Sequence, residues 1–175
     1  MRLRSNNPIT SLFWNIDVPI YKPKAENDIT DWLKYHLEEN LSQKGIILNR
    51  EVEVLRGHGG IKGERLDIKV DLPLYGRQAV TVPIEVKGCW NPGVDNAMET
   101  QLIQRYMVHH HCEFGLYIVG YFNCQQWFAS KDSRLQYVKM RTLEDTRIKF
   151  DDQARDLSSR YSLYVKSYVL DLSLP

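Results

Sequence analysis

The sequence predicts an α/β fold in which helices flank a mixed central β-sheet. Two runs, Arg65–Leu72 and Val80–Lys87, alternate apolar and polar residues, which is the period of a β-strand. A third run, Phe114–Phe122, is continuously apolar and β-prone, as in a buried central strand. A stretch with helical spacing precedes this third run. The order strand, helix, strand predicts a βαβ crossover, which makes the last strands parallel.

Length and composition describe a single soluble domain. The chain has 175 residues, of which 43% are hydrophobic and 26% charged. Its net charge of +1 excludes a global basic field, so any nucleic-acid contact must come from a local patch. Three cysteines without metal-type spacing predict free thiols in a reducing compartment. No apolar run reaches membrane length, and we expect a cytoplasmic protein with no membrane contact.

The N-terminal residues 1–25 are expected to be an extension that packs on one domain, residues 26–175. Several prolines favour extended or irregular structure there. Trp14 and Ile16 are the side chains expected to contact the domain. Next, helical spacing predicts a helix from Asn27 to Gln43, capped by Asn27 or Asp28. The run Ile46–Leu55 predicts the first strand of the sheet.

The two alternating runs are expected to form an antiparallel hairpin. If its turn is centred on Gly76, facing residues have numbers that sum to 152, as Asp67 and Glu85 do (67 + 85 = 152). The Cβ atoms of such a pair lie roughly 4.5–5.5 Å apart. Lys87 lies two residues beyond Glu85 and therefore projects from the same polar face.

Two carboxylates this close repel each other unless a cation lies between them. Oxygen ligands on rigid strands suit Mg²⁺, for which Mn²⁺ can substitute. A neighbouring lysine can orient an attacking water or neutralise charge on a phosphoryl group. The pattern is typical of metal-assisted phosphodiester hydrolysis. The alternative is an ordinary solvated hairpin face, on which acids pair with bases across strands.

Asp67 on one strand and Glu85-Val86-Lys87 on the next resemble the core motif of the PD-(D/E)XK nuclease superfamily. Leu66 stands where that motif often has proline. The resemblance implies a restriction-endonuclease-like core and a magnesium site formed by Asp67, Glu85 and the backbone carbonyl of Val86. It also implies that Lys87 activates water or stabilises the transition state. As an exposed strand residue, Lys87 should be replaceable by alanine without loss of folding.

In many members of this superfamily an acidic residue on the first helix reaches the metal. Glu26 is the best match, so the resemblance makes it a further candidate ligand. The alternative is a carboxylate stabilised by the dipole of its own helix.

A helix is expected from Asp95 to about His111, after the Pro92-Gly93 break. Its Gln101–Tyr106 segment resembles the Gln-x-x-x-Tyr helix of RecB-type members, with one residue more. The resemblance implies that Gln101, Arg105 and Tyr106 contact nucleic acid or position the catalytic lysine, and the extra residue leaves open whether Gln101 or Arg105 takes the polar role. The alternative is ordinary helix surface for Gln101 and core for Tyr106. The consecutive histidines His109–His111 point in different directions on a helix and are not expected to hold a metal.

The C-terminal part predicts a polar segment, a helix and a last strand. Basic residues in Ser130–Phe150 either line a nucleic-acid groove or solvate a loop. A helix is expected over Asp151–Arg160 and a strand over Leu163–Leu172.

Residues 26–170 as a whole resemble nuclease effector domains of bacterial anti-phage and restriction-type systems, which are often attached to NTPase modules. Glu85–Trp90, Gln101–Tyr106, Gly115–Phe122 and Trp127 carry that likeness. It implies a Mg²⁺-dependent nuclease, with DNA favoured over RNA and endonuclease action favoured. The candidate protein partners are an NTPase or sensor module and a second copy of the chain. The alternative is a nuclease-fold binding or scaffolding module that no longer cuts.

Overall fold

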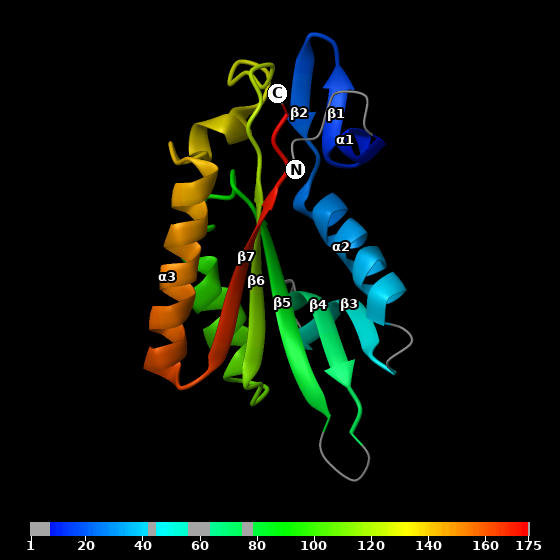
Figure 1. Ribbon diagram of the computed structural model, residues 1–175, viewed down its shortest axis with the longest axis vertical. Helices are drawn as coiled ribbons and strands as arrows, with labels where there is room; N and C mark the ends of the chain where they lie inside the picture. The colour runs from blue at the N-terminus through cyan, green and yellow to red at the C-terminus, as the bar shows by residue number, and fades with distance from the viewer. Residues whose placement is uncertain (1–7, 42–44, 56–63, 75–78, 175) are drawn as a thin grey trace, which may run out of the picture.

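The computed structural model describes residues 8–41, 45–55, 64–74 and 79–174 (Figure 1). A five-stranded sheet with the order β3-β4-β5-β6-β7 forms its centre. The first three strands are antiparallel and the last three are parallel, so the predicted α/β fold with a mixed sheet is confirmed. The strands are β3 (Ile47–Leu55), β4 (Glu64–Leu72), β5 (Val80–Gly88), β6 (Phe114–Tyr121) and β7 (Tyr164–Asp171).

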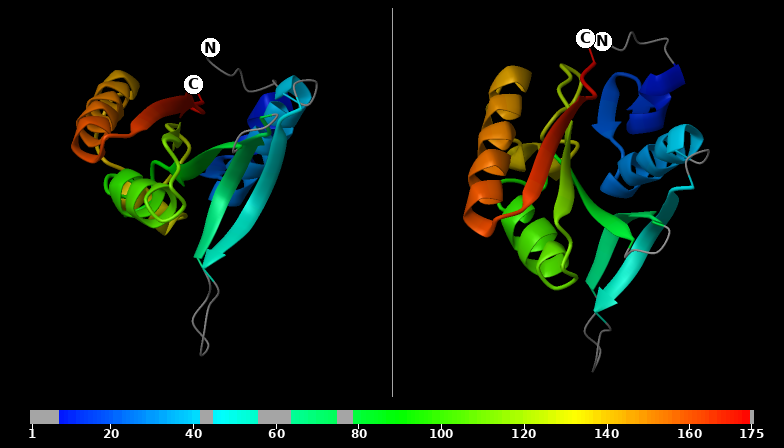
Figure 2. Two further views of the ribbon diagram at one scale, coloured as in Figure 1. Left: turned by 90° about the horizontal axis from the view of Figure 1, so that it is seen from below. Right: turned by 60° about the horizontal axis from the view of Figure 1, so that its bottom comes forward.

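Helices cover both faces of the sheet (Figures 1 and 2). Helix α2 (Glu26–Leu41) contacts β3, β4 and β5 on one face, where Ile84 and Val86 of β5 join its apolar cluster. On the other face, a π-helix, η2 (Met98–Met107), contacts β5 and β6, and α3 (Leu143–Tyr161) contacts β7. The central strands therefore lie between two apolar layers, and the sheet's residues alternate between them.

The β4–β5 hairpin has the predicted register. Its Cα partners run from Ile68–Ile84 to Leu72–Val80, and each pair of numbers sums to 152. The turn expected at Gly76 lies outside the described residues. Pairing stops at Ile68–Ile84, although β4 begins at Glu64 and β5 continues to Gly88. Backbone groups of β5 beyond Ile84 therefore have no ladder partner in β4.

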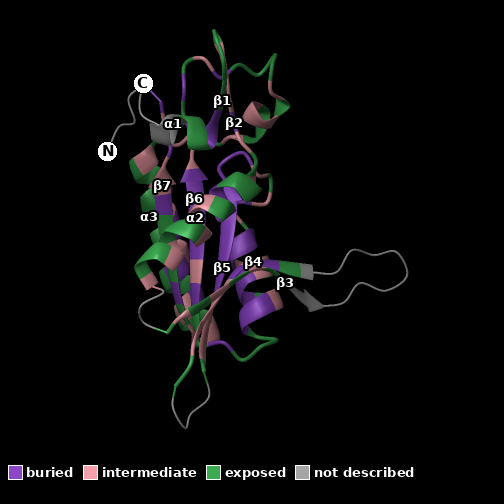
Figure 3. Cartoon of the chain, turned by 90° about the vertical axis from the view of Figure 1, so that its right-hand side faces the viewer, coloured by how far each residue is buried: buried purple, intermediate pink, exposed green. Residues whose placement is uncertain are grey.

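Strand β5 is buried from Pro83 to Gly88, because β6 pairs with it from Ile84 to Gly88 and helices cover both its faces (Figure 3). The expectation that Lys87 is an exposed strand lysine is wrong: it is 8% exposed. Position in a hairpin does not imply solvent access when a crossover helix packs on the polar face.

The N-terminal residues contribute to the core. They form a short helix, α1 (Pro8–Phe13), and a two-stranded sheet of β1 (Trp14–Asp17) and β2 (Ile20–Pro23). Trp14 is buried, and its Nε1 donates to the carbonyl of Leu172 at 2.8 Å. Ile16, which was also expected to pack, is 42% exposed.

Several element bounds differ from the prediction. The predicted Asp95–His111 helix is the shorter π-helix η2, and α2 begins one residue early, at Glu26. Helix α3 begins at Leu143 instead of Asp151, because Thr142 and Asp145 form a capping box. In that box the backbone N–H of Asp145 donates to Thr142 Oγ1, which stabilises the first turn.

Basic residues of the segment before α3 are engaged within the protein. Arg134 pairs with Asp132 and donates to the carbonyls of Pro23 and Lys24. Arg141 forms a two-bond pair with Asp95. These arginines hold loops together, which weakens the expectation that they line a nucleic-acid groove. No helix in the described ranges is long and apolar enough to cross a membrane.

Candidate active site

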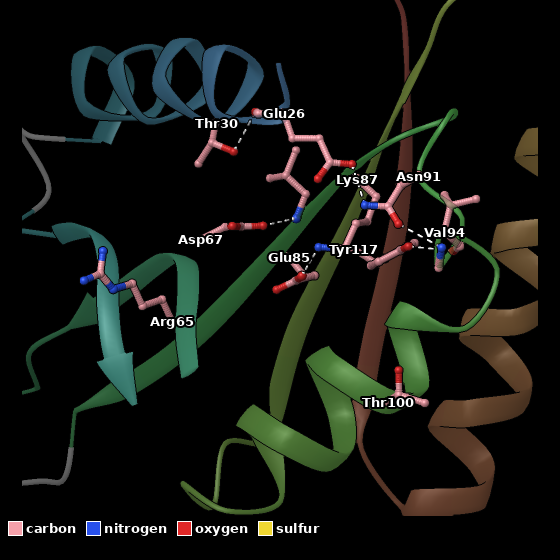
Figure 4. Close-up of polar contacts among 12 residues, drawn as sticks. Glu26, Thr30, Arg65, Asp67, Glu85, Lys87, Asn91, Val94, Thr100 and Tyr117 are labelled. Carbon is pink, nitrogen blue, oxygen red and sulfur yellow. Dashed lines mark hydrogen bonds and ion pairs between the residues drawn. The ribbon is translucent and has the colours of Figure 1, made fainter. Parts of the chain in front are cut away.

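The site forms where the β4–β5 ladder ends. Asp67 lies one residue beyond the last pair, and its Oδ2 accepts a hydrogen bond of 2.8 Å from the backbone N–H of Val86 (Figure 4). The side chain thus replaces a missing strand partner and is fixed against β5. An extended residue directs its N–H and C=O toward the same neighbour, so the Val86 carbonyl also faces the Asp67 side.

Glu85 is the most deeply buried acid of the site. It is 2% exposed; its Oε1 pairs with Lys87 Nζ, while Oε2 is buried and has no hydrogen-bond partner among the described residues. Burial, and then the charge of Asp67, raise the pKa of Glu85 to about 7, although Lys87 opposes the shift. An incompletely satisfied buried carboxylate of this kind favours binding of a cation.

Asp67 and Lys87 complete the central group (Figure 4). Burial raises the pKa of Asp67 above its usual value, even though Lys87 and the Val86 N–H favour the charged form. For Lys87, burial alone would lower the pKa, but the charges of Glu85 and Asp67 outweigh it and the net shift is upward. Lys87 therefore remains a cation, paired with Glu85.

Glu26 reaches this region from the first turn of α2. Its Oε1 accepts hydrogen bonds from the backbone N–H of Gly88 at 2.8 Å and from Asn91 Nδ2 at 2.9 Å. Its charge also raises the pKa values of Asp67 and Glu85. Glu26 is therefore electrostatically part of the site, besides lying at its own helix N-terminus.

The donor set suits magnesium only in part. The carboxylates of Asp67 and Glu85 are oxygen ligands, which a hard cation prefers. The unpartnered Glu85 Oε2 and the orientation of the Val86 carbonyl also fit such a cation. Among the described residues, however, no three histidine, cysteine, aspartate or glutamate side chains gather as a metal-binding group. Two carboxylates with open positions for water and substrate are a common arrangement for Mg²⁺.

Two neighbours that sequence reasoning missed close the site. Tyr117 of β6 lies beside Glu85 in the parallel register, is fully buried, and donates from its hydroxyl to the carbonyl of Val94 at 2.7 Å. Its place in an apolar strand gave no signal of this. Asn91 follows β5 in an Asn-Pro-Gly turn, and only that turn composition marked it. A side chain at Gly88 would meet the Trp90 ring at 2.6 Å, so this turn requires glycine.

The three candidates for nucleic-acid contact all lie on η2. Tyr106 is 3% exposed and its hydroxyl donates to the carbonyl of Arg65 at 2.5 Å, which ties η2 to β4. Gln101 and Arg105 are half-buried. In η2 the N–H of Val108 bonds to the carbonyl five residues back, at 2.9 Å. This wider turn accounts for the extra residue between Gln101 and Tyr106. Their contact with nucleic acid stays a prediction.

The histidines His109–His111 are exposed beyond the end of η2. Within the part of the chain that the structure describes, they join no group of three or more potential metal ligands.

Comparison with known proteins gives one match. Residues 4–123 fit the model of a family described as "Domain of unknown function (DUF8371)". Searches of curated proteins and of solved structures gave no significant match. The matched segment holds every residue of the site, from Glu26 to Tyr117, and crosses the expected boundary at residue 26. It covers more than half of the chain, which therefore belongs to the DUF8371 family.

Proposed function

We propose that the protein is a metal-dependent nuclease that hydrolyses phosphodiester bonds, with DNA favoured over RNA and internal cleavage favoured over end-wise cleavage. One observation carries the proposal: Asp67, which is partly buried and fixed to the Val86 N–H, lies at the end of the ladder with the buried Glu85–Lys87 pair of the neighbouring strand. Burying two like charges destabilises the fold. A function that needs both charges explains their presence.

Magnesium, or manganese in its place, would be held by Asp67, Glu85 and the Val86 carbonyl, with Glu26 as a further candidate ligand. When bound, such an ion neutralises the carboxylates, polarises the phosphodiester and lowers the pKa of a coordinated water. The restriction-endonuclease-like core implied by the motif belongs to the same proposal.

The side chains supply orientation and charge. The Val86 N–H holds Asp67 Oδ2 in place, so this carboxylate needs little rearrangement to act as a ligand. Lys87 directs a fixed positive charge at the site, where it stabilises negative charge that develops on the phosphoryl oxygens. Its poor exposure strengthens that interaction, because little water screens it.

The alternative function, a nuclease-fold module that binds or scaffolds without cutting, is favoured by the direct ion pair between Lys87 and Glu85. In that case the pair is purely structural, and no cation is required. The two proposals differ in whether hydrolysis occurs and whether it needs a divalent ion.

The test uses the purified full chain with supercoiled plasmid, single-stranded DNA and RNA, each with Mg²⁺ or with EDTA. The proposal predicts cleavage of at least one substrate with Mg²⁺ only, and loss of cleavage in Asp67→Asn. The control is Asp71→Asn, on the same strand, which should cut like the parent. Binding of nucleic acid without cleavage of any substrate would favour the scaffolding alternative.

A role as an effector in anti-phage defence, with an NTPase or sensor module as partner, rests on the sequence resemblance. Phage should form fewer plaques on bacteria that express the parent than on bacteria that express Asp67→Asn. Equal plating at equal protein levels would remove the defence role and leave the nuclease proposal standing.

A further inference from the structure

We propose that Asn91 is a positioning residue that holds the Glu26 carboxylate at the cation site. The inference rests on the proposed function, because it gives Glu26 a part in binding the divalent ion. It adds a residue outside the Asp-Glu-Lys motif, supplied by the turn after β5.

Asn91 is itself held rigidly. Its Oδ1 accepts from the N–H of Gly93 at 2.8 Å, its backbone N–H donates to Gly88 at 2.9 Å, and its carbonyl accepts from Val94 at 3.0 Å. Three local hydrogen bonds fix the turn. The remaining polar group of the side chain, the Nδ2 donor, bonds to Glu26. The asparagine therefore links a rigid turn to α2, across a sequence separation of 65 residues.

The contact determines how Glu26 is oriented. Both donors, Asn91 Nδ2 and the N–H of Gly88, bond to the same oxygen, Oε1. The structure records no hydrogen bond to Oε2 among the residues it describes. A glutamate side chain has several rotatable bonds and loses about 1.5–2 kcal/mol of rotamer freedom when fixed. Two donors on one oxygen restrict that freedom and leave the second oxygen for a ligand.

The chemical type of the donor also matters. A lysine or arginine at position 91 would neutralise Glu26, whereas an amide orients it and leaves its negative charge intact. That charge acts on the site, because it raises the pKa values of Asp67 and Glu85. A second, independent observation that points to a cation ligand is Glu85, which is 2% exposed and has an unpartnered Oε2.

The experiment is a double-mutant cycle of Mg²⁺ binding, measured by isothermal titration calorimetry on the full chain. Asn91→Ser keeps a hydroxyl that can accept from Gly93 but removes the donor to Glu26, without a change of charge. Glu26→Ala removes the carboxylate, and the double variant combines both changes. Asn96→Ser, at an exposed position of the following turn, is the matched control.

We expect Asn91→Ser to weaken Mg²⁺ binding about 10-fold, the usual effect of losing an outer-shell partner. Asn96→Ser should bind like the parent. In the Glu26→Ala background, Asn91→Ser should have no further effect, because a positioning residue acts only through the group it holds. Thermal melting confirms that the variants are folded; if Asn91→Ser is not, Asn91→Thr takes its place.

Unchanged binding in Asn91→Ser, or two losses that multiply independently, would overturn the inference and leave the nuclease proposal intact. A parent that binds Mg²⁺ but cuts nothing would overturn the proposed function, while the cycle still decides the role of Asn91. A parent that binds neither Mg²⁺ nor Mn²⁺ would overturn both.

Discussion

The β4–β5 hairpin carries two groups of acids and lysines on one face, and they differ in burial and in how far their hydrogen bonds are satisfied. Near the turn, Asp71 accepts from Lys69 Nζ at 2.9 Å and from Thr81 Oγ1 at 2.6 Å, so both its oxygens are satisfied. Beyond the end of the ladder, Glu85 is buried and keeps one oxygen without a partner. We call these the turn group (Lys69, Asp71, Thr81) and the buried group (Asp67, Glu85, Lys87).

The difference shows what distinguishes an ordinary hairpin face from a site. The turn group is what the solvated-face alternative describes, with Lys69 36% exposed and its charges screened by water. In the buried group, η2 and Tyr117 exclude water, and the acids repel each other. The turn group therefore supplies matched controls for each change in the buried group.

The largest expected effect is on stability. Lys87→Ala leaves Glu85 buried without its cationic partner, which lowers the free energy of unfolding by about 3–5 kcal/mol. Lys69→Ala breaks a partly exposed pair and should lower it by less than about 1 kcal/mol. Urea unfolding at neutral pH measures both. Equal losses in the two variants would show that burial does not separate the groups.

The next effect is on the pH dependence of stability. The Glu85 pKa is raised from 4.5 to about 7, so the folded state holds this proton more tightly than the unfolded state. Stability should therefore fall as the pH rises from about 4.5 to about 7, by on the order of 3 kcal/mol at most. Glu85→Gln should remove most of this fall and leave the part that comes from the raised pKa of Asp67, and Asp71→Asn should retain the whole fall. Parallel curves for the parent and Glu85→Gln would contradict the assignment.

Magnesium should stabilise the parent through the buried group. An ion that binds only the folded state adds about 2.7 kcal/mol at a concentration of 100 times its Kd. Asp67→Asn keeps an oxygen for the Val86 N–H and removes the repulsion. It should be at least as stable as the parent without metal and gain less from Mg²⁺. Thermal melts with and without Mg²⁺ test this, with Asp71→Asn gaining as much as the parent. If Asp67→Asn instead melts lower without metal and Mg²⁺ shifts neither curve, the acids are ordinary ion-pair partners.

The smallest effect concerns the attachment of η2. Tyr106→Phe loses one hydrogen bond to the carbonyl of Arg65 and should lower the free energy of unfolding by about 1 kcal/mol. The loss should be equal with and without Mg²⁺, as chemical denaturation can show. A loss of Mg²⁺ stabilisation in this variant would mean that η2 also fixes the metal ligands.

Local pattern was enough to predict the hairpin. The alternation of the two runs, with facing residue numbers that sum to 152, predicts the register that is observed from Ile68–Ile84 to Leu72–Val80. Asp67 and Glu85 come directly after the last of these pairs. The parallel crossover to β6 followed from an apolar run after a helical stretch. Local rules suffice there because strand period and turn position are encoded by neighbours in the sequence.

Burial and long-range contacts could not be predicted in this way. The exclusion of water from Lys87 depends on how η2 packs on the sheet, and the Glu26–Asn91 bond joins residues that are distant in the sequence. The π-helical form of η2 also differs from the α-helix that the spacing predicted. In each case packing between distant segments determines the outcome, and the residue pattern of a single segment carries no information about that packing.

The measurement that tests the central claim most directly compares plasmid cleavage by Lys87→Ala and Lys69→Ala with that of the parent. All three are assayed with Mg²⁺, at a temperature where melting curves show each to be folded. We predict that the parent and Lys69→Ala cut at similar rates, while Lys87→Ala is slower by at least about 100-fold, as for loss of a charge that stabilises the transition state. Cleavage by Lys87→Ala at the parent's rate would contradict the account.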